Sequence, residues 1–305
     1  MKNKKIEVTF LNMVIGSLVL AIKRFSKTRE LMPVKVIEDF KLIKDIKKIN
    51  NSDSMSQGIY QKGRKHYFIK TWHGNIKDLN YFMLAKEFNN STILSEIYLK
   101  LTKNKDVRLP KIYGYIENRN TLSVIYEYID GKSLEDLSLK NQILYLTKVE
   151  YFIREAGKKI SVNNKFVVKK SASYYLQLLP VISLALIIKS PENTFNIVRS
   201  SSEIFLLGIK QLNSKLVLNH GDFSPDNFIV KGTKIYITDP ENMSFTLPGF
   251  DLATIKAIDK YSNITKQIID VANDKFIYKY SCLQLSIGSG TFMKINKSYL
   301  RKAIT

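Results

Sequence analysis

The sequence predicts an α+β fold in two parts, a small antiparallel sheet followed by a larger, mostly helical region. Short runs between residues 54 and 131 alternate apolar and polar residues, which is the pattern of half-buried strands. From about residue 140 the apolar residues recur at helical spacing. With 305 residues, of which 45% are hydrophobic, the chain can bury a large core. We therefore expect lobes at residues 36–131 and 132–305, preceded by an apolar helix within residues 1–35.

The N-terminal segment combines lysines with an apolar run, Phe10–Ile22. A signal sequence has this composition, but no small-residue cleavage site follows and basic residues come directly after the run. Asn12, Gly16 and Lys23 share one narrow strip of the predicted helix, opposite a broad apolar face. Such a helix can pack on the sheet lobe, or it can lie in a membrane interface with its basic residues against anionic lipid.

The sheet lobe begins with a predicted hairpin. Gly58–Lys62 and His66–Lys70 form two runs of alternating polarity on either side of a Gly-Arg turn. Two further strands are expected at Leu109–Tyr115 and Leu122–Gly131, the second of which ends at a turn. A helix with inward-facing apolar residues is predicted between the pairs at Thr92–Leu101, and another is expected to start near Ser133.

The segment Asn219–Asn227 has the residue types that phosphoryl transfer requires. Asp222 can accept a hydroxyl proton, and Asn227 five residues later and Asp239 after a predicted hairpin can both hold Mg²⁺. For the His-Gly-Asp triplet alone, an ordinary turn with Gly221 at positive φ is a sufficient explanation. The combined spacing favours a phosphoryl-transfer site, because the structural context that supports the motif is present as well.

These motifs resemble those of the aminoglycoside and choline phosphotransferases, whose usual form is His-Gly-Asp-Leu-His-Pro-Gly-Asn followed by Ile-Asp-Trp/Phe-Glu. Pro225 and Glu241 match that pattern. Ser224 stands at the second His, Asp226 at the Gly, and Pro240 at the aromatic residue. The resemblance implies a two-lobed, protein-kinase-like fold, with ATP as phosphate donor and Mg²⁺ as the metal. The departures put the choice of acceptor in doubt more than the reaction type.

The same resemblance assigns a nucleotide-binding lysine and its partner. Lys70 ends the second strand where the family has the lysine that binds the α- and β-phosphates, although a solvated lysine is the simpler explanation of this residue alone. We expect Glu96 to hold Lys70, because its interval to the next strand matches the family better than that of Glu87 does. An exposed helix glutamate is the alternative for Glu96.

Other nucleotide contacts are expected before the first strand and after the fourth. Ser54 and Ser56 lie in a polar loop whose hydroxyls can hydrogen-bond phosphate oxygens, and a plain surface loop explains them nearly as well. Glu-Tyr-Ile-x-Gly resembles the family's hinge between the lobes. The resemblance implies that Glu127, Tyr128 and Ile129 contact adenine through their main chain.

The helical region contains the apolar run Val181–Ile188, which is too short to span a bilayer, and we expect a buried core helix there. Asp251 matches a family aspartate near a helix start, where capping is a sufficient explanation. The single Cys282 excludes an internal disulfide and fits a reducing compartment. We therefore expect a cytoplasmic protein, with peripheral contact to the inner face of a membrane as the alternative for its N-terminal helix.

The formal net charge of +21 bears on the acceptor. A pocket built from such a surface repels a polycation, so we expect a neutral or anionic acceptor, such as a phosphorylated sugar or an acidic glycolipid. A bias toward lysine spread over a solvated surface is an equal explanation. Nucleic-acid binding is not expected, because the lysines are dispersed and no recognised module accompanies them.

Together these observations predict an ATP-dependent phosphotransferase that acts on a hydroxyl of a small molecule, a saccharide or an envelope glycolipid. A protein Ser/Thr kinase is the first alternative, disfavoured by Gly221 and by Asp-Pro-Glu in place of Asp-Phe-Gly. A catalytically silent pseudokinase that serves as a binding module is the second. It is disfavoured because every charged catalytic position is filled.

Overall fold

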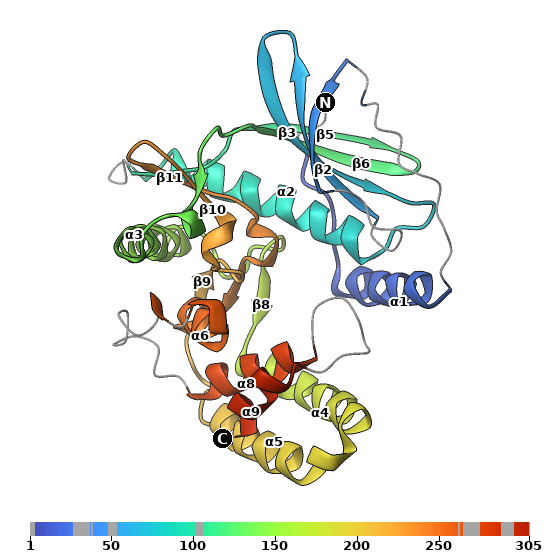
Figure 1. The fold of residues 1–305 in the computed structure, drawn as a ribbon, viewed down its shortest axis with the longest axis vertical. Helices are drawn as coiled ribbons and strands as arrows, with labels where there is room; N and C mark the ends of the chain where they lie inside the picture. Colours follow the sequence, from blue (N-terminus) through green and yellow to red (C-terminus); the bar gives the residue numbers. More distant parts are fainter. Residues whose placement is uncertain are drawn as a thin grey trace. The chain divides into compact units, whose positions relative to one another are not determined.

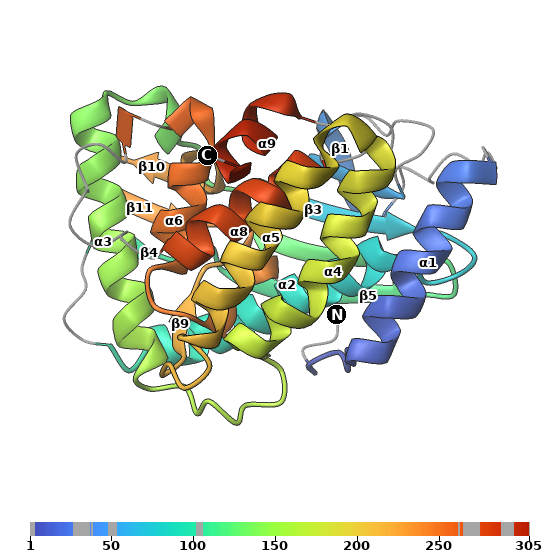
Figure 2. The same ribbon diagram turned by 90° about the horizontal axis from the view of Figure 1, so that it is seen from below.

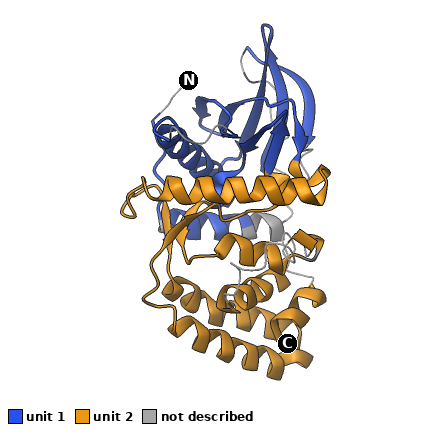
Figure 3. Cartoon of the chain, turned by 90° about the vertical axis from the view of Figure 1, so that its left-hand side faces the viewer, with its two compact units in different colours: residues 1–133, 228–242 blue, residues 134–227, 243–305 orange. Residues whose placement is uncertain are grey.

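The chain forms two compact units. In the computed structural model, the described residues are 4–26, 37, 39–47, 54–101, 106–261, 263–264, 275–287 and 296–304. Unit 1 contains residues 1–133 and 228–242, and unit 2 contains residues 134–227 and 243–305 (Figure 3). Unit 1 thus extends to Ser133 rather than to the expected boundary at Gly131. It also includes a segment that the sequence analysis assigned to the C-terminal lobe.

Unit 1 is built on a five-stranded antiparallel sheet in the order β1-β2-β3-β6-β5. The strands are β1 (Lys41–Lys47), β2 (Met55–Lys62), β3 (Lys65–His73), β5 (Ile112–Asn118) and β6 (Thr121–Glu127). The predicted hairpin is confirmed, with Gly63 in the turn at a φ of 61°. Strand β2 begins earlier than expected, so Ser56 lies within it rather than in a loop.

Helix α2 (Leu79–Tyr98) lies across one face of this sheet (Figure 1). Its N-cap is Asp78, whose carboxylate accepts hydrogen bonds from two backbone amides of the first turn and from the Trp72 indole. The sequence analysis predicted only its second half. Periodicity fails here because buried residues occur on almost every side of α2, so the helix has no polar face to mark it.

Helix α1 (Phe10–Ser26) packs on the start of α2. Gly16 makes the close contact, since a Cβ atom there would lie 2.9 Å from the backbone nitrogen of Leu79. Packing on the sheet lobe is therefore what the structure shows for this strip of the helix. The opposite strip, which includes Leu11, Ile15 and Leu18, is exposed.

A second sheet in unit 1 carries the hairpin that precedes Asp239. Its order is β4 (Val107–Arg108), β11 (Lys234–Ile237), β10 (Phe228–Lys231) and β7 (Lys132–Ser133). The hairpin of β10 and β11 confirms the prediction, with Phe228 paired to Ile237. Gly131 allows the close approach of β7 to β10, because a Cβ atom there would lie 2.7 Å from the carbonyl oxygen of Val230.

Unit 2 is mostly helical around a small three-stranded sheet in the order β8-β12-β9. The elements are β8 (Val168–Lys170), β9 (Val217–Asn219), β12 (Ser244–Thr246), α3 (Leu139–Gly157), α4 (Ala172–Lys189), α5 (Thr194–Ile209), α6 (Phe250–Ala257), α8 (Lys275–Ser286) and α9 (Lys297–Ile304). The helix expected near Ser133 is only a 3₁₀ turn, Leu134–Asp136, and α3 starts five residues later.

The helical core of unit 2 lies between α4 and α5 on one side and α8 and α9 on the other (Figures 1 and 2). Leu179, Leu186 and Ile204 are among its buried members. The expectation of a buried core helix at Val181–Ile188 holds for only one side of the helix. One face of α4 is buried in this core, while the other face is exposed.

Candidate active site

Lys70 is buried in unit 1, with only 4% of the residue exposed, between two carboxylates. Its Nζ donates to Glu87 Oε2 at 2.9 Å and forms an ion pair with Asp239. Strand β3 presents the lysine on the face that α2 covers, and α2 supplies Glu87. The alternative of a solvated strand-end lysine is therefore wrong. A buried ammonium requires such partners, because an unpaired charge in this position would be strongly unfavourable.

The expectation that Glu96 holds Lys70 is wrong, and Glu87 takes that place. Glu96 follows Glu87 by nine positions on the same helix, which at about 100° per residue puts the two glutamates on opposite sides of it. The Glu96 side chain is 57% exposed and forms an ion pair with Lys5. Glu96 was chosen for its interval to the next strand, and that interval does not determine which side of the helix a glutamate occupies.

Asp239 has an unusual backbone conformation, with a φ of 52°. Asp tolerates the left-handed region better than most residues, and such outliers concentrate at functional sites. Helix α2 fixes the segment after it, because Asn90 Nδ2 donates to the Pro240 carbonyl oxygen at 2.7 Å. Asn90 follows Glu87 by three residues on α2, so one face of the helix positions both partners of the lysine. Sequence periodicity gave no signal for Asn90.

Ser54 and Ser56 are not gathered around Lys70. The Ser54 hydroxyl donates to Asp78, the N-cap of α2, at 2.9 Å. Ser56 is paired with Thr71 across β2 and β3, so its side chain projects from the sheet face opposite to that of Lys70. Its hydroxyl lies 3.1 Å from the Nε2 atom of His73, whose pKa burial lowers to about 4. These hydroxyls contact other protein groups, and their binding of phosphate stays a prediction.

The expected hinge residues Glu127, Tyr128 and Ile129 lie at the end of β6. The backbone amide of Glu127 donates to the carbonyl oxygen of Lys111, and the Glu127 carboxylate accepts from the Lys111 amide. Ile129 is buried. The Glu127 amide is thus used within the sheet, and contact of residues 127–129 with a base stays a prediction.

In unit 2, the loop after β9 orders Asp222 and Asn227 against each other. Asn227 Nδ2 donates to the Asp222 carbonyl oxygen at 2.9 Å and to Ser224 Oγ at 3.2 Å. Ser224 Oγ in turn donates to the Asp222 carboxylate at 3.2 Å. Gly221 has a φ of 84°, which an arginine at this position would adopt only with strain. The loop therefore holds the carboxylate of Asp222 through Ser224 and its backbone carbonyl through Asn227.

Asp251 is a loop-holding residue whose role the sequence analysis missed. Its carboxylate accepts hydrogen bonds from the backbone amides of His220 at 2.7 Å and Gly221 at 2.8 Å, rather than capping α6. Burial, against the opposing effect of these two hydrogen bonds and with a smaller contribution from the negative charge of Asp222, raises the pKa of Asp251 to about 7. The position of Asp251 in the motif was noted, but the helix start nearby hid its contact with residues 31 positions earlier.

The side chains predicted to bind Mg²⁺ offer oxygen atoms, which are the ligands that this ion takes in nucleotide enzymes. No group of three or more His, Cys, Asp or Glu side chains that could hold a metal occurs among the described residues. Mg²⁺ in such enzymes binds one or two protein oxygens together with substrate phosphates and water, so a larger cluster is not required. Asp239 supplies a carboxylate, and Asn227 donates hydrogen bonds through Nδ2, which assigns Oδ1 as its possible metal ligand.

Lys70, Glu87 and Asp239 belong to unit 1, whereas Asp222 and Asn227 belong to unit 2. The predicted meeting of Asp222, Asn227 and Asp239 around one metal ion therefore stays a prediction. Within unit 1, the lysine, its helix glutamate and the aspartate after the hairpin are brought together. Within unit 2, the aspartate and asparagine of the loop are held in one hydrogen-bonded turn.

These elements define a protein-kinase-like α+β fold, with an antiparallel sheet and α2 in the N-terminal part and helices in the remainder. No family model matches the sequence, and no curated protein matches it. The fold, in contrast, is similar to those of solved structures. An ADP and hygromycin B complex of a thermostable mutant of aminoglycoside phosphotransferase APH(4)-Ia has a TM-score of 0.60 at 11% identity, over 87% of this chain and 90% of that one.

Two further neighbours have the same fold. Spectinomycin phosphotransferase APH(9)-Ia with ADP and spectinomycin has a TM-score of 0.55 at 15% identity, covering 87% of this chain and 88% of that one. The streptomycin and ATP complex of APH(2'')-IIa has a TM-score of 0.57 at 12% identity, covering 98% and 97%. At these identities the likeness establishes the fold. The resemblance to choline phosphotransferases stays a prediction, and the named acceptors do not support the expectation of a neutral or anionic acceptor.

Proposed function

We propose that this protein is an ATP-dependent phosphotransferase that transfers the γ-phosphate to a hydroxyl group of a small molecule or saccharide. The observation that carries the proposal is the buried Lys70 between Glu87 and Asp239. A lysine paired with a helix glutamate and an aspartate after the catalytic loop is the arrangement that phosphoryl transfer uses in kinase folds. The fold shared with phosphotransferases crystallised with ADP or ATP supports the same donor.

In this proposal, Lys70 binds the α- and β-phosphates, and Glu87 keeps its ammonium group in place. Adenine contacts the main chain of residues 127–129. Asn227 and Asp239 would hold Mg²⁺, which supplies neutralisation of the negative charge on the β- and γ-phosphates when bound. Asn227 immediately precedes β10 and Asp239 follows β11 by one intervening residue, so a short hairpin connects the two ligands.

Asp222 orients the acceptor hydroxyl and takes its proton. The acceptor oxygen forms a bond to the γ-phosphorus, the bond from that phosphorus to the bridging oxygen breaks, and ADP leaves with the electron pair. Ser224 and Asn227 hold Asp222 from within the loop. Asp251 fixes the backbone just before it. A catalytic base held in this way contributes about 10²- to 10⁴-fold to the rate.

The decisive experiment compares Asp222→Ala with Asp226→Ala, an exposed aspartate in the same loop. Labelled ATP would be offered with sugars, amino alcohols, aminoglycosides and lipid extracts. We expect Asp222→Ala to lower kcat by about 10³-fold while the Kd for ATP changes less than about 2-fold, and Asp226→Ala to retain activity. Nucleotide binding without transfer to any acceptor would indicate a pseudokinase instead. Label that appears only in protein would indicate a protein kinase.

The proposal specifies only that the acceptor carries a hydroxyl group. The positive charge of the chain favours a neutral or anionic acceptor, including a glycolipid, whereas the neighbouring structures contain aminoglycosides. The acceptor panel above separates these classes directly. For its location, we propose the cytoplasm, where ATP is available and the buried thiol of Cys282 stays reduced. The exposed apolar strip of α1 supports peripheral contact with an anionic membrane.

A further inference from the structure

Helices α4 and α5 of unit 2 form a hairpin with a broad exposed apolar face. They follow each other in the chain, joined by the 3₁₀ turn Pro191–Asn193, and they pack against each other. Ile188 and Phe195, on either side of this turn, are 72% and 78% exposed. The other exposed members are Val181, Leu184, Val198, Phe205, Leu206 and Ile209. These eight side chains are called the outer face below.

The outer face is large for a protein that stays monomeric. Its side chains are 44–78% exposed and together present on the order of 700 Å² of apolar surface. The largest apolar patch of a typical monomer is about 300–600 Å², whereas each partner of a standard interface buries about 800 Å². By length and composition α4 is apolar enough to cross a membrane, but its inner side packs in the core with α8 and α9. The area therefore corresponds to one half of a stable dimer interface.

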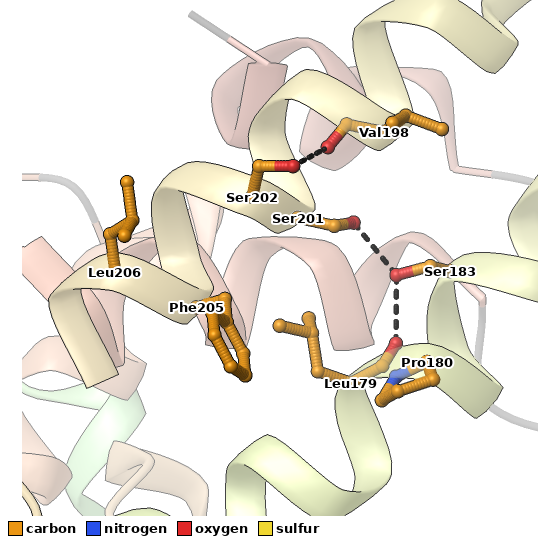
Figure 4. Close-up of a pocket in the computed structure, with 8 residues that line it drawn as sticks. All are labelled: Leu179, Pro180, Ser183, Val198, Ser201, Ser202, Phe205 and Leu206. Atoms are coloured by element: carbon orange, nitrogen blue, oxygen red, sulfur yellow. Dashed lines mark hydrogen bonds between the residues drawn. The ribbon is translucent and has the colours of Figure 1, made fainter. Parts of the chain in front are cut away.

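A groove of about 410 Å³ between the two helices shapes this face (Figure 4). Its apolar lining consists of Leu179, Pro180, Val198, Phe205 and Leu206. The hydroxyls of Ser183 and Ser201 lie 2.7 Å from each other, and each lies 2.7 Å from a carbonyl oxygen one turn earlier. Ser202 donates to the Val198 carbonyl oxygen at 3.0 Å. The groove can therefore be covered without leaving a serine hydroxyl unpaired.

The charged residues of the hairpin lie along one border of the outer face. Helix α4 contains a single charged residue, Lys189, whose Nζ atom is buried. Arg199, Glu203 and Lys210 are exposed, and their spacings of four and seven residues place them on one side of α5 and its C-cap. Glu192 is exposed in the turn, seven residues before Arg199. Acidic and basic residues thus alternate along this border, and their formal charges sum to zero.

The order of these charges is self-complementary in the antiparallel direction. Glu192 lies nine positions before Ser201 and Lys210 nine positions after it. Arg199 lies two positions before Ser201 and Glu203 two positions after it. When two copies of α5 cross antiparallel near this midpoint, each acidic side chain faces a basic one of the other copy. A two-fold axis makes every such pair twice, because residue i of one copy meets residue j of the other and the reverse.

The apolar side chains of α5 follow the same symmetry to within one position. Phe195 and Leu206 lie six positions before and five after the midpoint, and Val198 and Phe205 lie three before and four after. Large side chains of one copy are thus opposed by different large side chains of the other. Ser202 lies where the helices would cross most closely, and its side chain is small and bonded to its own helix. A second copy of this chain therefore matches the face in area, charge order and shape.

We propose that two copies of this chain form a two-fold symmetric dimer through their α4–α5 hairpins, whose four helices pack as an antiparallel bundle. Glu192 pairs with Lys210 of the second copy, and Arg199 pairs with Glu203. Glu203 already accepts from Lys279 of its own chain at 2.8 Å, and because 48% of its side chain is exposed it can accept from a second cation. The net charge of +21 opposes association only at long range, where salt at about 0.15 M screens it beyond about 8 Å.

Sedimentation velocity of the full chain tests the assembly. At about 150 mM salt and about 50 µM protein we expect a dimer. The variant Phe195→Gln/Leu206→Gln should weaken dimerisation at least about 10-fold, because each apolar side chain is lost twice per dimer. Leu99→Gln is the matched control, since Leu99 is an exposed leucine in unit 1, and it should dimerise as the wild type does. A monomeric wild type under these conditions overturns the proposal, as does a dimer that the double variant leaves intact.

A charge exchange tests the antiparallel register. Lys210→Glu should weaken dimerisation about 5-fold or more, because it places two carboxylates opposite each other at both ends of the interface. Glu192→Lys/Lys210→Glu reverses both charges and should restore dimerisation to within about 3-fold of the wild type. Restoration requires position 192 of one copy to face position 210 of the other. A double variant as weak as the single variant therefore overturns the proposed interface.

A cysteine near the two-fold axis gives a direct measurement. The single native cysteine, Cys282, is buried and does not compete. Under oxidising conditions Ser202→Cys should form a covalent dimer, because this position meets its own duplicate across the axis. Ser17→Cys, which makes the same change at an exposed serine of α1, should form little. Equal cross-linking of the two variants would contradict the interface.

Other occupants of the outer face give different results in the same experiments. Vesicles of phosphatidylcholine with about 30% phosphatidylglycerol that bind a monomeric wild type, but not Phe195→Gln/Leu206→Gln, would make lipid the occupant and overturn the proposal. Circular dichroism and ATP binding of each variant check that its fold is unchanged. The dimer does not depend on the enzymatic activity proposed above, so its failure leaves that activity standing and is separable from it.

Discussion

At the scale of single residues, the partners of Lys70 give the sharpest prediction. Removing one partner of a buried ion pair leaves an uncompensated charge, so we expect Glu87→Gln to lower the free energy of unfolding by about 3 kcal/mol. We also expect its KM for ATP to rise at least about 10-fold, because the ammonium group loses the contact that aims it. Urea unfolding and initial-rate kinetics measure the two effects.

Glu96→Gln is the matched control for this experiment, since it makes the same chemical change on the same helix. Its ion pair with Lys5 is exposed, and exposed pairs contribute less than about 1 kcal/mol. Stability and KM should therefore stay close to those of the wild type. If Glu87→Gln and Glu96→Gln changed stability and KM equally, the burial of the Lys70–Glu87 pair would not explain the effect of Glu87→Gln.

Asp251 predicts a pH dependence of stability. Its pKa is about 7 in the folded protein and near 3.8 when unfolded, so the folded state holds its proton more tightly. Its contribution to stability is fully present below about pH 4 and is lost as the pH rises through 7. Between pH 5 and pH 8, the wild type should lose about 3 kcal/mol relative to Asp251→Asn. Urea unfolding of both proteins at the two pH values provides the measurement, and parallel profiles would contradict the assignment.

The same substitution tests what Asp251 does for catalysis. An asparagine side chain has one acceptor oxygen, so the amides of His220 and Gly221 can no longer share two carboxylate oxygens. The loop before Asp222 should become less rigid. We expect kcat to fall about 10-fold or more while the Kd for ATP is nearly unchanged, because the residue acts through the position of Asp222. A change confined to the Kd would contradict this role.

At the scale of elements, the close packing of α1 on α2 depends on Gly16. A larger side chain would meet the backbone of Leu79 and the carbonyl carbon of Asp78, which cannot move without disturbing the α2 N-cap. We expect Gly16→Leu to cost about 1–3 kcal/mol of packing and the amides of α1 to exchange with solvent about 10-fold faster. Ser17→Leu, one position along on the exposed side, should leave exchange unchanged.

The elements also show why some of the fold could be predicted from sequence. The hairpins at β2–β3 and β10–β11 are local, and alternation together with a glycine turn at Gly63 or Gly232 determines each of them. Helix α2 is different, because sheet, α1 and the segment after Asp239 cover it from several directions. Its buried polar residues therefore interrupt the apolar period. The partner of Lys70 was assigned wrongly because the interval of a glutamate to the next strand does not determine which side of the helix it occupies.

The contacts of the candidate site are also of two kinds, those within a short stretch of chain and those between residues far apart in the sequence. The hairpin before Asp239 could be predicted because its pattern lies within a short stretch of chain, and the roles of Asp222 and Asn227, which rest on spacing in the same stretch, stay predictions. The bond of Asp251 to the His220 amide and that of Asn90 to the Pro240 carbonyl join residues far apart in the sequence. No spacing rule in a single sequence encodes such contacts. The exposed side of α4 escaped prediction likewise, because an apolar helix gives the same pattern whether its second side is covered or not.

At the scale of the whole molecule, positive charge is carried by both units. Unit 1 has 27 Lys and Arg residues against 15 Asp and Glu residues, and unit 2 has 21 against 12. ATP is an anion, so any approach to this protein is made in an attractive field that salt screens. Between about 25 and 250 mM salt the screening length falls from about 20 Å to about 6 Å. Long-range attraction should be largely lost over that range.

We therefore expect the KM for ATP to rise several-fold over this salt series while kcat changes little, since the field acts on encounter rather than on the chemical step. The same series applied to each accepted acceptor reports its charge: the KM of an anionic acceptor should rise with salt, and that of an aminoglycoside should fall as repulsion is screened. Asp226→Ala, which makes the loop that contains Asp222 more positive, should steepen the rise for ATP slightly. Salt-independent KM values for both substrates would show that the charge of +21 is spread over surfaces that neither substrate approaches.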